Sequence, residues 1–232
     1  MPRPAILPPA QAYALWASSY PAHAHNPVMQ AEERAMLGLM PTSLQDRAVI
    51  DAGCGSGRYV LHALRRGAAQ VIGVDLSPEM LGRARAELAL CTHAASVELA
   101  QASLTALPLA DARADLTVCG LVIGHLERLE PALAELHRVT RPGGTVLCSD
   151  FHPIGHALGW LRDFKSDGQR YAVRHTPHLY SHWHAACASV GLEVERVLEP
   201  LLDPVDIPTG AHFDPRALEV PVALVFQLRR AP

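Results

Sequence analysis

A loop with three glycines, VIDAGCGSGRY at residues 49–59, constrains the fold of this 232-residue chain more than any other stretch. Two β-branched residues and an acid lead into the loop, and a helical pattern follows it. Glycine adopts backbone conformations that other residues avoid, so such a loop brings backbone N–H groups close to a ligand at the start of a helix. The stretch therefore predicts a strand, a ligand-binding turn and a helix in succession.

Short apolar runs alternate with helical patterns from residue 48 onward, which is typical of a doubly wound, mostly parallel α/β sheet. Ser77 and Pro78 predict the start of a helix, because serine caps the first turn and proline suits its first position. Gly191 predicts the end of a helix over Tyr180–Val190. The expected strands are 47–53, 69–77, 96–104, 114–124, 145–151, 192–200 and 220–230.

The composition of the chain limits its class of fold and the kinds of partner that it can bind. Hydrophobic residues make up 49% and charged residues 19%, which favours a globular fold over disorder. A formal charge of −3 without basic runs argues against nucleic acid, since phosphate binding needs a concentrated positive face. Five scattered cysteines without a CxxC pair indicate reduced thiols. The prolines that interrupt the N-terminus indicate neither a signal peptide nor a membrane span. We therefore expect a cytoplasmic protein with no membrane contact, either a monomer or a homodimer.

The glycine loop differs from the dinucleotide type in spacing and in charge. Dinucleotide loops read G-x-G-x-x-G and seat a pyrophosphate, whereas this loop reads G-x-G-x-G. Asp51, two residues before the first glycine, suits a cationic amine better than a phosphate. Asp75 ends the next strand, where a doubly wound fold presents an acid to a ribose diol. S-adenosylmethionine, an adenosine-bearing cation without phosphate, fits these features.

Two stretches carry a family resemblance: VIDAGCGSGRYVLHALRRGAAQVIGVDLSPEMLGRAR at 49–85 and LTALPLADARADLTVCGLVIGHLERLEPALAELHRVTRPGGTVLCSD at 104–150. They resemble the motifs of the class I S-adenosylmethionine-dependent methyltransferases, in their small-molecule, type 11-like branch. The resemblance implies a Rossmann-like α/β fold, with a mostly parallel seven-stranded sheet, its last strand antiparallel, and helices on both faces. It implies a single domain made of a helical cover (1–40), a donor-binding core (41–150), a lid insertion on the substrate side (151–184) and C-terminal strands (185–232).

The resemblance also implies a donor site. Asp51 and the glycines would surround the methionine part, Asp75 would hold the ribose, and Leu76 and Met80 would flank the adenine. Ser103 stands where many relatives have an acid for the adenine amino group, and relatives often have aspartate at the places of Ala14 and Pro21. The residues expected to bind S-adenosylmethionine are Tyr13, Tyr20, Asp51, Gly53, Cys54, Gly55, Asp75, Leu76, Met80, Ser103, Leu104 and Gly120.

Two histidines are candidate catalytic residues. Methyl transfer is an in-line displacement, so alignment of the acceptor matters most, and a base helps only where the acceptor must lose a proton. His125 follows the fourth core strand, beside the expected methyl-donor position, and His152 follows Asp150 at the end of the fifth. The alternative for His125 is a packing or capping role, and for His152 and Asp150 a role in a strand-end turn.

The span 152–184 holds six of the thirteen histidines. Their spacing lacks a clean three-ligand pattern, so no metal is expected. Asp167-Gly168 is a turn signal that predicts a small hairpin, which would form a flap over the acceptor. The alternative for each side chain is an ordinary packing or solvent role. The residues expected to line an acceptor pocket are His156, Trp160, His175, His178 and Tyr180.

These observations predict a methyltransferase that acts on a small organic molecule at oxygen or nitrogen, with oxygen slightly preferred because a histidine base matters more for a hydroxyl. One alternative is a protein that binds S-adenosylmethionine or S-adenosylhomocysteine without catalysis. Another is an NAD(P)-dependent oxidoreductase, which the loop spacing disfavours.

Overall fold

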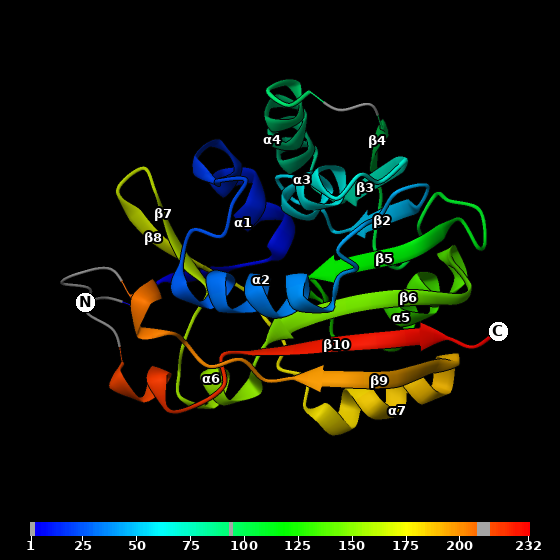
Figure 1. Cartoon of the computed structure of the whole chain (residues 1–232). Helices are drawn as coiled ribbons and strands as arrows, with labels where there is room; N and C mark the ends of the chain where they lie inside the picture. The colour runs from blue at the N-terminus through cyan, green and yellow to red at the C-terminus, as the bar shows by residue number, and fades with distance from the viewer. Residues whose placement is uncertain (1–2, 93–94, 208–213) are drawn as a thin grey trace.

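A seven-stranded sheet forms the centre of the computed structural model, which describes residues 3–92, 95–207 and 214–232 (Figure 1). Six of its strands are parallel, and β10 alone runs antiparallel to both of its neighbours. The predicted Rossmann-like sheet with an antiparallel last strand is therefore confirmed. In spatial order the strands are β4 (Ser96–Gln101), β3 (Gln70–Asp75), β2 (Ala48–Ala52), β5 (Ala114–Gly120), β6 (Thr140–Phe151), β10 (Ala223–Arg230) and β9 (Leu192–Leu198).

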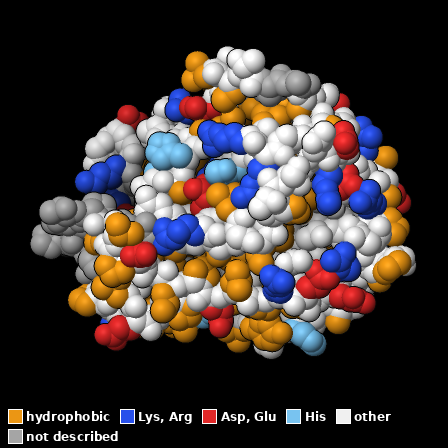
Figure 2. Space-filling view, in the orientation of Figure 1, with side chains coloured by type: hydrophobic (Ala, Val, Ile, Leu, Met, Phe, Trp, Pro, Cys, Tyr) orange, Lys and Arg blue, Asp and Glu red, His pale blue; other side chains and the backbone are white. Residues whose placement is uncertain are grey.

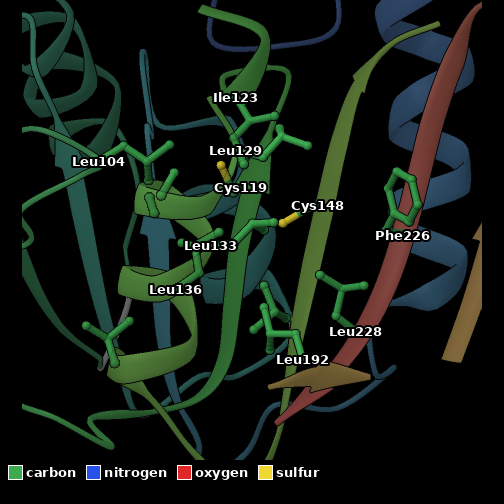
Figure 3. Packing of buried hydrophobic residues seen from close by; sticks show 14 of the residues in the cluster. Leu104, Cys119, Ile123, Leu129, Leu133, Leu136, Cys148, Leu192, Phe226 and Leu228 are labelled. Carbon is green, nitrogen blue, oxygen red and sulfur yellow. The ribbon is translucent and has the colours of Figure 1, made fainter. Parts of the chain in front are cut away.

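Helices cover both faces of the sheet, as predicted. Neighbouring residues of β2 show why, because Val49 packs in one buried cluster and Ile50 in the other. Val49 faces α2 (Pro27–Leu39), α3 (Arg58–Arg65) and α4 (Pro78–Ala89), while Ile50 faces α5 (Glu130–Val139) and α7 (Tyr180–Val190). Figure 3 shows Leu133 and Leu136 of α5 beside β5 and β6, within a buried cluster that also contains Phe226 and Leu228 of β10. Burial of each such side chain contributes roughly 1.5–3 kcal/mol.

The predicted helix ends have the expected caps. The Ser77 hydroxyl accepts a hydrogen bond from the N–H of Met80 at 3.2 Å, and Pro78 begins α4. Gly191, with φ +80°, follows the last residue of α7. No helix within the described ranges is long and apolar enough to cross a lipid bilayer.

Several predicted strand boundaries differ from the structure, and the two largest differences are at the end of β5 and the start of β6. β5 ends at Gly120 and not at residue 124, because Leu121 has φ +58° and so leaves the extended conformation; the 3-10 helix η2 (Ile123–His125) follows. β6 begins at Thr140 and not at residue 145. Thr140 pairs with Ala114 before the register shifts, and Gly143, with φ +70°, accommodates the irregularity.

A second, three-stranded sheet lies beside the carboxyl ends of β5 and β6 (Figure 1). The predicted hairpin forms its strands β7 (Asp163–Ser166) and β8 (Gln169–Val173), joined at Asp167-Gly168. Its third strand, β1 (Ala5–Leu7), comes from the chain start and pairs in parallel with β8. The short helices α1 (Pro9–Trp16) and η1 (Ala17–Ser19) then lead toward α2, while α6 (Pro153–Ala157) links β6 to the hairpin. The small sheet thus joins the two segments that flank the core.

Candidate active site

A cavity of about 320 Å³ opens at the carboxyl ends of β2, β3 and β5, beneath α1. Its lining comes from the glycine loop, the strand ends, the N-terminal cover and the segment before β7. All twelve residues expected to bind the donor line this cavity, and so does His125. The twelve are Tyr13, Tyr20, Asp51, Gly53, Cys54, Gly55, Asp75, Leu76, Met80, Ser103, Leu104 and Gly120.

Gly53 and Gly55 shape the floor of the cavity. Both adopt left-handed conformations, with φ of +80° and +53°. A Cβ atom on Gly53 would lie 2.5 Å from Cγ2 of Val122, whereas one on Gly55 would lie 3.3 Å from Cε of Met80. The packing therefore admits no side chain at Gly53, whereas a Cβ atom on Gly55 would require only a small shift of Met80.

The N–H groups of the loop are bonded inside the protein. Those of Gly53 and Cys54 donate to the carbonyl oxygen of Val74 at 2.7 and 2.9 Å. That of Gly55 donates to Oδ2 of Asp75 at 2.8 Å. A pyrophosphate needs free N–H donors at this place. The hydrogen bonding of the loop thus disfavours a dinucleotide.

Asp51 is a buried carboxyl group at the end of β2. Its Oδ2 accepts a hydrogen bond from the N–H of Val60 in α3 at 3.1 Å. Burial raises the pKa of Asp51 from 3.8 to about 7, although the nearby Arg58 opposes this shift. Arg58 forms its ion pairs with Glu32 and Glu33, so a cationic ligand would offset the cost of burying the charge of Asp51.

Asp75 occupies the corresponding place at the end of β3. Its two oxygens accept hydrogen bonds from the N–H groups of Gly55 and Ser77, each at 2.8 Å. Burial raises the pKa of Asp75, while these N–H groups lower it. The carboxylate therefore fixes the loop to the start of α4 and still borders the cavity.

The wall beyond Asp75 is mostly apolar. Leu76 is 55% exposed, and Met80 is buried against the cover. The hydroxyl of Ser103, the expected partner for an adenine amino group, lies 2.8 Å from the hydroxyl of Thr105 and accepts from its N–H at 3.2 Å. The Ser103 hydroxyl therefore stabilises the turn that contains Thr105.

The wall near Gly120 is held by a buried polar cluster. A Cβ atom on Gly120 would lie 2.4 Å from Cε2 of Tyr59, so the ring packs directly on this backbone. The Tyr59 hydroxyl donates to Glu32 at 2.7 Å, and Glu32 also accepts from Arg58 at 2.9 Å and from Ser149 at 2.5 Å. Since Glu32 belongs to α2, this cluster fastens the cover helix to the start of α3.

His125 makes two hydrogen bonds at the edge of the cavity. Its Nδ1 lies 3.2 Å from the carbonyl oxygen of Arg174 and therefore carries the proton, so Nε2 accepts from the Tyr13 hydroxyl at 2.9 Å. Burial, together with the positive charge of Arg162, lowers the pKa of His125 from 6.5 to about 3. The ring is neutral at physiological pH and is a weak proton acceptor.

Arg162, just before β7, brings a positive charge to the cavity. Its Nη1 donates to the carbonyl oxygen of Leu121 at 3.1 Å, and its Nη2 donates to the Tyr20 hydroxyl at 2.9 Å. The guanidinium also lies over the rings of Tyr13 and Phe151, 5.5 and 5.1 Å from their centroids. These contacts link the lid segment to the cover and to the end of β5.

Comparison with known proteins places the chain in a family. The family model described as a methyltransferase domain matches residues 50–148. A malonyl-[acyl-carrier protein] O-methyltransferase of Serratia marcescens is 33% identical over 197 residues, which cover 83% of this chain and 71% of the relative. The chain belongs to the class I S-adenosylmethionine-dependent methyltransferases.

Other relatives of this methyltransferase agree. An enzyme of the same name from Pseudescherichia vulneris is 34% identical over 72% of this chain and 64% of its own length. Several curated relatives are matched over only 52–64% of their length. The crystal structure of an S-adenosylmethionine dependent methyltransferase from Mesorhizobium loti is 25% identical, with a TM-score of 0.68, over 86% of this chain and 98% of that protein.

The other predicted site residues do not line the cavity. They are His152, His156, Trp160, His175, His178 and Tyr180. His152 caps α6, since its Nδ1 accepts from the N–H of Ile154 at 3.2 Å, and its Nε2 lies 3.2 Å from Glu199. The turn role considered for His152 therefore matches its contacts. His178 lies 3.0 Å from the carbonyl oxygen of Leu126.

The remaining lid candidates are dispersed. His175 is bonded to Asp150 at 2.9 Å. Trp160 donates its ring N–H to Asp214 at 3.2 Å, His156 is exposed on α6, and Tyr180 begins α7, stacked beside a ring of β10. A direct contact between these side chains and an acceptor remains a prediction. Among the residues that the structure describes, no three His, Cys, Asp or Glu side chains lie together as metal ligands.

Sequence reasoning missed Arg162 and the polar cluster around Glu32. Neither belongs to a local motif, because their contacts join segments more than 25 residues apart. A single arginine between Trp160 and Asp163 carried no signal of its own. The same applies to one glutamate on an amphipathic helix.

Proposed function

We propose that this methyltransferase transfers the methyl group of S-adenosylmethionine to an oxygen atom of a small organic acceptor. The observation that carries the proposal is a cavity floored by an internally bonded glycine loop and bordered by two carboxyl groups, Asp51 and Asp75. This chemistry suits a cationic nucleoside without phosphate. The names of the relatives, which are O-methyltransferases, support oxygen over nitrogen.

The residues around the cavity fit this donor. Gly53 and Gly55 line the cavity, and the close packing of Val122 on Gly53 fixes the backbone against which the donor would lie. Asp51 would attract the cationic amino group, Asp75 would accept from the ribose hydroxyls, and Leu76 with Met80 would flank the adenine. When bound, the donor supplies an electrophilic methyl group on sulfur.

The chain itself contributes orientation and the exclusion of water. Tyr13 and Tyr20 of the cover and Arg162 of the lid line the cavity, and we expect them to close over the bound donor and acceptor. Holding the acceptor in line with the methyl group supplies most of the rate enhancement such a displacement needs. The closed cover also keeps water from competing for the methyl group.

The proposal includes no role for His125 as a base. Its low pKa and its hydrogen bond from Tyr13 leave it unsuited to deprotonate a hydroxyl. We therefore expect His125→Asn to lower kcat by less than tenfold, whereas loss of a true general base typically costs 10²–10⁴-fold. The measurement is turnover with labelled donor, and a drop of 1,000-fold with unchanged donor affinity would restore the base hypothesis.

Asp51 predicts a pH dependence of donor binding. Burial raises its pKa to about 7, so the folded chain holds this proton more strongly than the unfolded chain does. The group therefore lowers stability as pH rises from about 4 to about 7, and its ionised form, present above pH 7, binds the cationic donor best. By calorimetry, we expect donor affinity to rise by up to about tenfold per pH unit below pH 7 and then to level off. Asp51→Asn should flatten this profile; an equally steep profile in that variant would contradict the assignment.

The charges on the face shown in Figure 2 do not favour a macromolecular polyanion as acceptor. Figure 2 shows Lys and Arg side chains interspersed with Asp and Glu over one face of the molecule, so this face offers phosphates no concentrated positive area. A small acceptor, free or attached to a carrier, is the better match for a cavity of about 320 Å³.

The direct test is product formation. Pure protein incubated with methyl-labelled S-adenosylmethionine and a metabolite extract is expected to yield labelled small molecules in which the label is attached to oxygen. Mild alkaline hydrolysis releases the label from a methyl ester but not from a methyl ether. Donor binding without any labelled product would favour a non-catalytic binding protein. A change in nicotinamide absorbance without donor affinity would favour an oxidoreductase.

A further inference from the structure

Arg162 is the one cavity-lining cation that has no carboxylate partner among the described residues. Arg58, the other arginine in the lining, is paired with Glu32 at 2.9 Å and with Glu33 at 3.4 Å. Arg162 instead contacts a carbonyl oxygen, a hydroxyl and aromatic faces, which leaves its charge uncompensated. Arg162 is half-buried, and an unpaired charge partly removed from water is unfavourable unless a ligand compensates for it.

The guanidinium of Arg162 has more N–H groups than its hydrogen bonds to Leu121 and Tyr20 use. It carries five N–H groups, and the structure uses one on each terminal nitrogen, toward Leu121 and Tyr20. Leu121 holds its carbonyl in place through a left-handed conformation, with φ +58°. Such strain is retained where the surroundings over-determine it, often at ligand sites. Arg162 is thus fixed at the cavity with its planar fork only partly used.

A planar fork with free N–H groups matches a carboxylate, which accepts two parallel hydrogen bonds from it. The phenol of Tyr20 already accepts from Nη2, so it stands beside the same place. A phosphate is the less suitable anion, because the cavity floor already carries the two acidic groups Asp51 and Asp75. The charge distribution favours a small, singly charged organic anion at the lid end.

The surroundings of His125 support the same class of acceptor. The His125 ring, which faces Tyr13, is a weak proton acceptor. An alcohol or phenol would need such a base, whereas a carboxylic acid is already ionised at neutral pH. Its oxygen has a free lone pair, so methyl transfer to it releases no proton.

We propose that Arg162, assisted by Tyr20, is the specificity-determining residue of the acceptor pocket, and that it binds the carboxylate of an organic acid. This inference rests on the proposed function and narrows it to acidic acceptors. Arg162 lies at the start of the lid hairpin, so binding of the acid also holds the lid against the cover through the Tyr20 contact.

The test uses the full chain saturated with S-adenosylhomocysteine. Calorimetry with matched pairs of carboxylic acids and their neutral methyl esters, from acetate and phenylacetate to malonyl-N-acetylcysteamine, measures the preference for charge. We expect at least one acid to bind ten or more times more tightly than its ester. Arg162→Gln should abolish this preference without changing ester affinity, and Arg162→Lys should retain part of it.

Two controls keep the result interpretable. Arg170→Gln removes an exposed arginine of the same hairpin and should leave every affinity unchanged. Affinity for S-adenosylhomocysteine, measured in every variant, shows whether the donor part of the cavity is intact. Acids that bind no better than their esters, or a preference that survives in Arg162→Gln, would overturn the inference. Acid binding through Arg162 without any labelled product would instead overturn the proposed methyl transfer.

Discussion

Gly53→Ala is expected to abolish measurable donor binding. The new Cβ atom would lie 2.5 and 2.7 Å from the two methyl groups of Val122, closer than real Cβ atoms come, and the residue would have to keep a φ of +80°. Valine is stiff about χ1, so it cannot turn away without moving the wall. We expect donor affinity to fall more than 100-fold and the free energy of unfolding to fall by about 2–4 kcal/mol.

Gly82→Ala is the matched control. Gly82 lies inside α4, and a Cβ atom there would meet nothing within 4 Å. Alanine in a helix interior is about 0.5–1 kcal/mol more favourable than glycine, so this variant should be slightly more stable and bind the donor normally. Calorimetry measures the donor affinity of both variants, and thermal unfolding measures their stability. A Gly53→Ala protein that binds like the original would show that the donor does not lie against this backbone.

Asp75→Ala has the second-largest expected effect. The change removes the acceptor for the N–H groups of Gly55 and Ser77, and it removes the group assigned to the ribose hydroxyls. Charge-assisted hydrogen bonds of this type are about twice as strong as neutral ones. We expect affinity for both S-adenosylmethionine and S-adenosylhomocysteine to fall about 100-fold, because each contains the same ribose.

Two companion variants separate ribose binding from loop folding. Asp75→Asn keeps the shape but offers one oxygen and an NH₂ group, so it should retain only part of the affinity. Glu79→Gln, on the exposed first turn of α4, removes a nearby charge but keeps an oxygen that can accept from the Ser77 hydroxyl, so donor affinity should not change. Full donor affinity in a folded Asp75→Ala protein would refute the assignment of the ribose to this carboxyl group.

Local sequence predicted the core because its signals are short-range. The alternation of Val49 and Ile50 between two buried clusters, the cap at Ser77 and the helix end at Gly191 each depend on a few neighbouring residues. β5 ends at Gly120, earlier than predicted, because Leu121 adopts a left-handed backbone conformation. Residue type alone does not predict that conformation for a leucine.

The lid side of the site was harder to predict. In the structure His152 caps a helix and Tyr180 lies on α7 beside a ring of β10, while the contact of the lid side chains with an acceptor remains a prediction. Periodicity indicates that a residue belongs to an element, but not which neighbour that element meets. Arg162 owes its position to Tyr20, 142 residues earlier, and such a contact depends on the whole topology.

The pairing of β1 with β8 has a mechanical consequence. Ala5–Leu7 hydrogen-bonds to the hairpin that follows Arg162, and the N–H of Arg174 donates to Leu7 at 2.8 Å. A hinge motion of the hairpin must either carry the first strand along or unzip it. Opening of the hairpin would therefore break or displace the hydrogen bonds between β1 and β8, and the rate at which those amide protons exchange with deuterium would report how often it opens.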